Sequence, residues 1–295
     1  MKKAFLQLHL AIFLAGFTGI FGKLIDLNEG WLVWYRLGIT SITMWILFSI
    51  TRKLQKVNFR DILKLTAIGF LAALHWCTFY GSIKYANISV ALVCFSATGF
   101  FTAIIEPLVH RKRINPSEII LGLLVILGIY IIFHFDPRYK TGIILGVICA
   151  ILLAFVMVIL RQFVQRINSE TILTYQLSGG WITLSLVMPF YYKQFPTDYI
   201  VPNLKDWIWL IILAWFCSVW AFQLSVNALK KLSAFTVNLT YNFEPVYGII
   251  LAFFIYHENE QLNWSFFIGL TLIALAVALQ TLRLWAQSRY SKKAA

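Results

Sequence analysis

Charged residues are scarce in this chain, and their scarcity excludes an ordinary soluble domain. They make up 13% of its 295 residues, while 60% of the residues are hydrophobic. A soluble domain carries about 25% charged residues. The apolar stretches are too long for barrel strands and lack strong alternation. The composition therefore predicts an all-α integral membrane protein that crosses the lipid bilayer several times.

Acidic residues are the scarcer charge, and the resulting net charge of +13 raises the question of nucleic-acid binding. The basic residues do not form one patch, however, because they lie in short clusters between the apolar stretches. Such clusters are typical of the cytoplasmic loops of membrane proteins, which are enriched in Lys and Arg. We therefore expect no nucleic-acid partner.

Cysteine is also rare, and its positions exclude the sites that cysteine usually builds. The four cysteines all lie inside apolar stretches, and none forms a C-x-x-C pair, so the sequence predicts neither a disulfide framework nor a zinc site. The sequence also has no Gly-rich phosphate loop, no G-x-S-x-G and no H-E-x-x-H. We expect a protein without metal or cofactor that is not an enzyme.

Long apolar stretches are abundant, and ten of them are long enough to be transmembrane spans. They cover approximately residues 5–25, 30–50, 62–84, 88–109, 117–134, 142–161, 171–192, 206–228, 234–256 and 264–285. If the N-terminus is cytoplasmic, the cytoplasmic segments hold 17 Lys and Arg and the outer segments hold 5. This asymmetry predicts that both termini are cytoplasmic. The compact ten-span form suggests a multi-pass protein of a bacterial inner membrane.

A weak internal repeat divides the chain into two halves. Residues 147 positions apart match at several places, among them Lys84 with Lys231 and Gly122 with Gly269. The basic segment 111–113 falls on the acidic segment around Glu258, on the opposite side of the predicted membrane. We therefore predict two five-span repeats of inverted orientation, residues 1–137 and 138–295. Inverted repeats are common in transporters, in which the substrate site lies near the bilayer midplane between the two halves.

The ninth apolar stretch carries the most unusual polar residues. Glu244 is its only charge and lies at its middle, where a carboxylate facing lipid costs about 2.5–3.5 kcal/mol or more. Pro245 follows and predicts a kink or an opening of the helix. Glu244 could bind a substrate ammonium, carry a coupling proton or lock the helix through hydrogen bonds. The preceding turns add three polar side chains to the candidate site: Asn238, Tyr241 and Asn242.

A second group of candidate residues lies on other spans. Arg36 is about six residues into its span from the outside, or roughly 9 Å deep. Its guanidinium could hold a substrate carboxylate or reach the outer headgroups. If Arg36 and Glu244 face one cavity, they suit a zwitterion such as an amino acid. Residues on neighbouring spans could line that cavity, with lipid or core packing as the alternative for the aromatic ones: His75, Trp76, Tyr80, Gln176 and Gln223.

With these features the chain resembles the drug/metabolite transporter superfamily, in particular its EamA-type ten-span members. The resemblance covers nearly the whole chain and rests on the five-plus-five spans and on four short features: Arg36, Pro245-Val246, Glu258 and Gly269. The first half departs from the pattern, because Thr98 and Arg111 stand where the second half has Pro245 and Glu258. The resemblance implies a metabolite or amino-acid exporter, or an uptake carrier, with spans five and ten as peripheral struts.

These features predict a secondary transporter that exports a small metabolite, such as an amino acid, by alternating access. Because the sequence has no nucleotide-binding segment, an ion or substrate gradient would supply the energy, and a proton or cation would be the coupling partner. The alternative is a membrane sensor or a channel without active transport. A homodimer is left open.

Overall fold

The computed structural model describes residues 2–111, 113, 115–135, 137–229, 231–232, 237, 240–241 and 243–293, and its described elements are all helical. The α-helices are α1 (Lys2–Leu24), α2 (Glu29–Ile50), α3 (Phe59–Tyr85), α4 (Ile88–Phe95), α5 (Thr98–His110), α6 (Pro116–Phe135), α7 (Lys140–Leu160), α8 (Ser169–Gln194), α9 (Leu204–Ala214), α10 (Ala221–Leu229), α12 (Glu244–Tyr256) and α13 (Trp264–Lys293). Three short elements join them: the 3-10 helices η1 (Pro137–Tyr139) and η3 (Glu258–Gln261), and the π-helix η2 (Trp215–Trp220).

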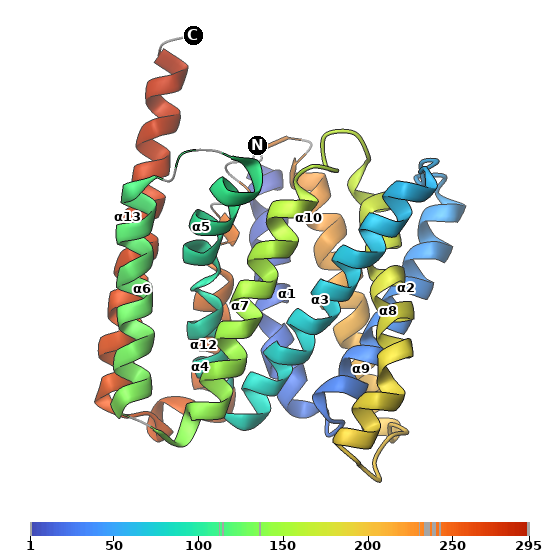
Figure 1. Ribbon diagram of the computed structural model, residues 1–295, viewed down its shortest axis with the longest axis horizontal. Coiled ribbons are helices and arrows are strands. Elements are labelled where there is room, and N and C mark those ends of the chain that lie inside the picture. Colours follow the sequence, from blue (N-terminus) through green and yellow to red (C-terminus); the bar gives the residue numbers. More distant parts are fainter. Residues whose placement is uncertain are drawn as a thin grey trace.

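The helices form a bundle whose two terminal helices reach the same end. Figure 1 shows that α1 begins and α13 ends on one side of the bundle. Seven helical segments of the described chain are long and apolar enough to cross a membrane, and α6 and α12 contribute shorter apolar segments. The all-helical membrane fold is thereby confirmed, while the ten spans and the cytoplasmic location of the termini remain predictions.

Asparagine residues begin four of the long helices, and their spacing repeats between the halves. The side chains of Asn28 and Asn168 accept the first free backbone N–H groups of α2 and α8. Asn58 and Asn203 do the same for α3 and α9. Asparagine is favoured at this position because its oxygen satisfies a donor that has no partner inside the helix. The pairs lie 140 (168 − 28) and 145 (203 − 58) residues apart, so equivalent spans begin with the same local device.

The fourth and ninth spans are both interrupted, at equivalent positions. In the first half, α4 ends at Phe95 and α5 begins at Thr98. In the second half, α12 begins at Glu244, directly before Pro245. Proline is well placed in a first helical turn, because its missing N–H group would have no helical partner there. Pro245 lies 147 residues (245 − 98) after the first residue of α5, and the kink or opening predicted there remains a prediction.

Glycine residues set the close crossings that hold the bundle together. A Cβ atom on Gly69 of α3 would lie 1.9 Å from the backbone oxygen of Gln176 and 2.6 Å from the backbone nitrogen of Gly180, both on α8. A Cβ atom on Gly128 of α6 would lie 2.7 Å from the carbonyl oxygen of Gly269 on α13. These helices meet backbone to backbone, as small residues permit in membrane proteins. Figure 1 shows α6 and α13 as a pair at one edge of the bundle.

Candidate substrate site

Arg36 is the centre of a polar cluster inside the bundle. Only 3% of its surface is exposed, so its guanidinium points into the protein and does not reach the outer headgroups. Its Nη1 donates to the Tyr80 hydroxyl on α3, at 2.6 Å. Its Nε and Nη2 donate to the hydroxyl of Ser218 on η2, at 3.2 and 3.0 Å. Of the two predicted roles for Arg36, the structure supports the one in which it faces the interior.

Aromatic rings from α3 surround this guanidinium. The Arg36 carbon Cζ lies 4.2 Å from the centre of the Trp76 ring and 5.9 Å from that of Tyr80. Trp76 and Tyr80 are four residues apart on one helix, so they project from the same face. A guanidinium stacked on a ring is stabilised by the negative face of the aromatic system. Three of the predicted site residues are therefore brought together by α2 and α3.

Glu244 is the first residue of α12, where the ninth span is interrupted. The helix dipole favours a negative charge at this position. Its carboxylate interacts electrostatically with Arg36, yet no carboxylate of the described residues lies within 4.0 Å of the Arg36 nitrogens. Arg36 and the half-buried Glu244 therefore interact without forming a direct ion pair among the described residues.

His75 belongs to the packing between α3 and α7. It is buried, and its Nδ1 lies 3.0 Å from the backbone oxygen and 3.1 Å from the sulfur of Cys149. Its ring also lies against Phe95, with 6.0 Å between the ring centres. His75 is thus directed toward Cys149 of α7 and not toward the Arg36 guanidinium contacts described above.

The remaining predicted site residues lie in different places. Gln176 is buried, and its Oε1 has no hydrogen-bond partner among the described residues. Gln223 accepts a hydrogen bond from Lys53 at 3.5 Å, which ties α10 to the end of α2. The Tyr241 hydroxyl is hydrogen-bonded to Ser225. Asn238 and Asn242 lie outside the described residues.

Ser218 was missed by the sequence reasoning, although the sequence contains a signal for it. From Asn58 to Lys84 there are 26 residues, whereas the equivalent interval from Asn203 to Lys231 is 28. The second half therefore has two extra residues in this span. A π-helix accommodates an insertion within a helix, and such segments are frequent at functional sites. The segment η2 that carries Ser218 is such a π-helix.

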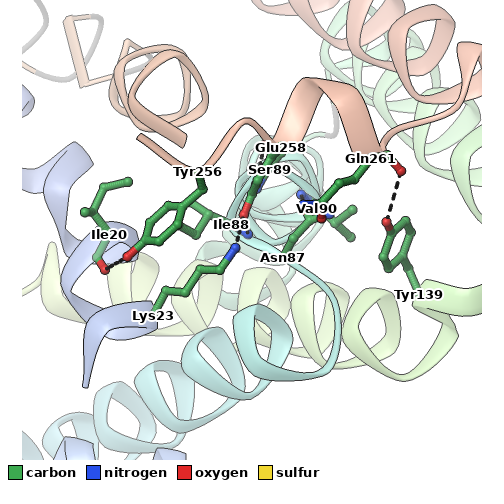
Figure 2. A network of polar contacts seen from close by, with 10 residues as sticks. All are labelled: Ile20, Lys23, Asn87, Ile88, Ser89, Val90, Tyr139, Tyr256, Glu258 and Gln261. Atoms are coloured by element: carbon green, nitrogen blue, oxygen red, sulfur yellow. Dashed lines mark hydrogen bonds and ion pairs between the residues drawn. The ribbon is translucent and has the colours of Figure 1, made fainter. Parts of the chain in front are cut away.

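Glu258 forms a second polar cluster, at the end of the bundle where α1, α4 and α12 meet. Its side chain is fully buried and accepts the backbone N–H groups of Ile88 and Ser89 at 3.1 and 2.9 Å, and the Ser89 hydroxyl at 2.7 Å. Lys23 donates to the same carboxylate at 2.9 Å and lies 4.3 Å from the centre of the Tyr256 ring. Figure 2 shows Lys23 and the start of α4 converging on this one side chain.

An apolar crevice lies apart from the Arg36 cluster. It has a volume of about 390 Å³ and lies between α2 and α8, and its lining residues are Trp31, Trp34, Ser185, Met188, Pro189, Tyr192 and Ile200. None of the predicted site residues lines it. In the part of the chain that the structure describes, no three His, Cys, Asp or Glu side chains are grouped as metal ligands.

The comparisons with known proteins agree with this architecture. The family model of the EamA-like transporter family matches residues 2–134 and again residues 140–282, close to the predicted division at 137. A Bacillus subtilis (strain 168) protein described as uncharacterized transporter YetK is 23% identical over 287 residues, which are 92% of this chain and 84% of that protein. A solved crystal structure has a TM-score of 0.64 at 15% identity, over 97% of this chain and 99% of that one, and so shares the fold. The chain belongs to the EamA-like transporter family.

Proposed function

We propose that the protein is a secondary transporter that moves a small metabolite, such as an amino acid, by alternating access and in the direction of export. The observation that carries the proposal is the convergence of the two repeats on one charged site. Arg36, Trp76 and Tyr80 come from the first repeat, and Ser218 and Glu244 come from the second. A site built from both halves changes its exposure when the halves move relative to one another.

The two charges of the site suit a substrate that carries both signs. Arg36 is buried without a carboxylate in contact, and the described part of Glu244's surroundings contains no cation within ion-pair distance. Isolated buried charges are costly, and a partner of opposite sign offsets that cost. An amino acid supplies both partners, since its carboxylate would bind Arg36 and its ammonium would bind Glu244.

The orientation in the membrane follows from the basic residues. The end of the bundle where α1 begins and α13 ends also holds the basic loops after α2 and α5. Because cytoplasmic loops are enriched in Lys and Arg, we assign this end to the cytoplasm and the Glu258 cluster to the outside. The assignment supports a ten-span protein of the inner membrane with both termini in the cytoplasm. A gradient of protons or cations would drive transport, with Glu244 as the residue that exchanges the coupling ion.

Untargeted metabolite profiling tests the proposal. Cells that express wild type, Glu244→Gln or Glu260→Gln at matched membrane abundance would be compared with cells carrying an empty vector. Glu260 is a suitable control because its side chain is 72% exposed and lies outside the site. We expect one metabolite class to leave the cells with wild type and with Glu260→Gln, and not with Glu244→Gln. Equal export by Glu244→Gln would remove Glu244 from the mechanism, and no movement with wild type would refute the carrier.

A channel is the competing function, and counterflow distinguishes it. Liposomes that contain the purified protein and a high internal concentration of the metabolite found above would receive a trace of labelled metabolite outside. A carrier accumulates the label transiently, because internal substrate returns the site to the outside, whereas a channel only equilibrates it. Transient accumulation is the result expected here.

A further inference from the structure

Ser218 holds one edge of the Arg36 guanidinium. A guanidinium has five N–H groups in a fixed plane. The Ser218 oxygen lies in the fork between Nε and Nη2, at 3.2 and 3.0 Å, and therefore occupies the side edge of that plane. Tyr80 accepts one further N–H group, from Nη1 at 2.6 Å. Three of the five donors are thus used by neutral hydroxyl groups that leave the positive charge uncompensated.

Two donors remain, one on each terminal nitrogen of the guanidinium. Each of Nη1 and Nη2 keeps one N–H group without an acceptor in the described residues. The Trp76 ring lies against the guanidinium, with its centre 4.2 Å from the Arg36 Cζ, which leaves the remaining N–H groups as the polar contacts for a ligand. N–H groups on the two terminal nitrogens can donate to the oxygens of a carboxylate.

The π-helix explains why Ser218 reaches Arg36. Each residue of an α-helix turns the chain by about 100°, so an extra residue would rotate every following side chain away from its partner. A π-turn absorbs one extra residue locally, and η2 thus accounts for one of the two extra residues of this span. Ser218 lies within this turn. The equivalent segment of the first half belongs to α3, which is an uninterrupted α-helix. The π-turn is therefore a feature of the second half and has no counterpart in α3.

We infer that Ser218 is a positioning residue, and that it orients Arg36 so that the terminal edge of the guanidinium binds a ligand carboxylate. The inference rests on the proposed function, since it names the substrate group that the transport site recognises. Ser218 acts through Arg36 and does not itself contact the ligand. The neutral hydroxyl fixes the guanidinium plane while leaving its charge for the carboxylate.

The test measures ligand-induced thermal stabilisation of the purified full-length protein. The probes are L-amino acids and simple mono- and dicarboxylates, the corresponding carboxamides, and inorganic phosphate, all at the same ionic strength. We expect a carboxylate to stabilise wild type and the carboxamides and phosphate to have no effect. Ser218→Ala should bind the effective carboxylate roughly tenfold more weakly while the melting temperature without ligand changes little. Ser218→Thr, which keeps the hydroxyl group, should restore binding.

Arg36→Lys provides a second measurement that does not depend on the folding of Ser218→Ala. Lysine keeps the charge but has no paired edge, so the variant should lose the preference for carboxylate over phosphate. Equal affinity of wild type and Ser218→Ala, or equal stabilisation by carboxamides, would overturn the inference. So would the absence of binding by every carboxylate tested. In that case export of another metabolite class in the profiling experiment would leave the carrier function standing.

Discussion

Removing the Glu258 carboxylate should destabilise the protein more than any other single change at the end of the bundle where α1, α4 and α12 meet. The side chain is fully buried and accepts four hydrogen bonds, of which two come from the first N–H groups of α4. Glu258→Ala leaves those two N–H groups and the Ser89 hydroxyl without an acceptor. Each unsatisfied buried group costs about 1–3 kcal/mol, and breaking a buried charged contact costs about 3–5 kcal/mol. We therefore expect a loss of about 3–5 kcal/mol.

Substitutions at Lys23 and Glu258 show how much each contact of the Glu258 cluster contributes to stability. Lys23→Met should cost only about 1–2 kcal/mol, because the Lys23 side chain is 33% exposed and the three other donors still hold the carboxylate. The loss of stability in Glu258→Gln should lie between the losses in Glu258→Ala and Lys23→Met. The amide oxygen of Gln still accepts hydrogen bonds, whereas its NH2 group faces other donors. Glu260→Ala is the matched control, because Glu260 is two residues further and largely exposed.

The melting temperatures of these variants can be measured in detergent with a thiol-reactive dye, which tests the predicted order of their stabilities. Cys94, Cys149 and Cys217 are buried free thiols that react only when the bundle opens. For a chain of this size about 1 kcal/mol shifts the melting temperature by roughly 2 °C, so Glu258→Ala should lower it by roughly 6–10 °C. Lys23→Met should lower it by roughly 2–4 °C. A larger fall in melting temperature in Lys23→Met than in Glu258→Ala would refute the reasoning. It would show that Glu258 stabilises the protein mainly through its ion pair with Lys23 and not through the N–H groups at the start of α4.

Two further predictions concern packing and topology. Gly69→Ala should lower the yield of folded protein sharply, because its Cβ atom would overlap the α8 backbone. The control Gly99→Ala places a Cβ atom where nothing lies within 4 Å, so its melting temperature should be unchanged or slightly higher. Glu260→Cys should react with a membrane-impermeant thiol reagent added to intact cells, whereas Arg113→Cys should react only after the cells are permeabilised. The opposite labelling pattern would invert the proposed orientation.

Much of the fold was predictable because membrane spans carry a strong local signal. Apolar stretches and basic loops each depend on neighbouring residues, and the family model matches the chain twice, over residues 2–134 and 140–282. The repeated N-capping asparagines, such as Asn28 and Asn168, were an additional signal of the repeat. A cap is a local feature, so it can be read from the sequence once helix starts are compared.

The site was predictable only in part, because its contacts join distant spans. Arg36, Trp76 and Tyr80 were proposed separately from their depth and residue type, and the structure brings them together. Gln223 was proposed for the same cavity, yet Lys53 binds it at the end of α2. Ser218 lies in a π-turn, and residue type alone does not reveal such a turn.

The crossing of α6 and α13 also bears on the relation between the two repeats. A Cβ atom on Gly128 would meet Ile273 and one on Gly269 would meet Ile132, so the two helices are antiparallel. Gly128 of α6 lies against Gly269, which is the repeat equivalent of Gly122 in the same helix α6 (269 − 122 = 147). At this point each helix therefore meets its own repeat equivalent, as in an isologous interface between two identical subunits. The α6–α13 contact thus has the antiparallel form that two copies of one helix make across a two-fold axis.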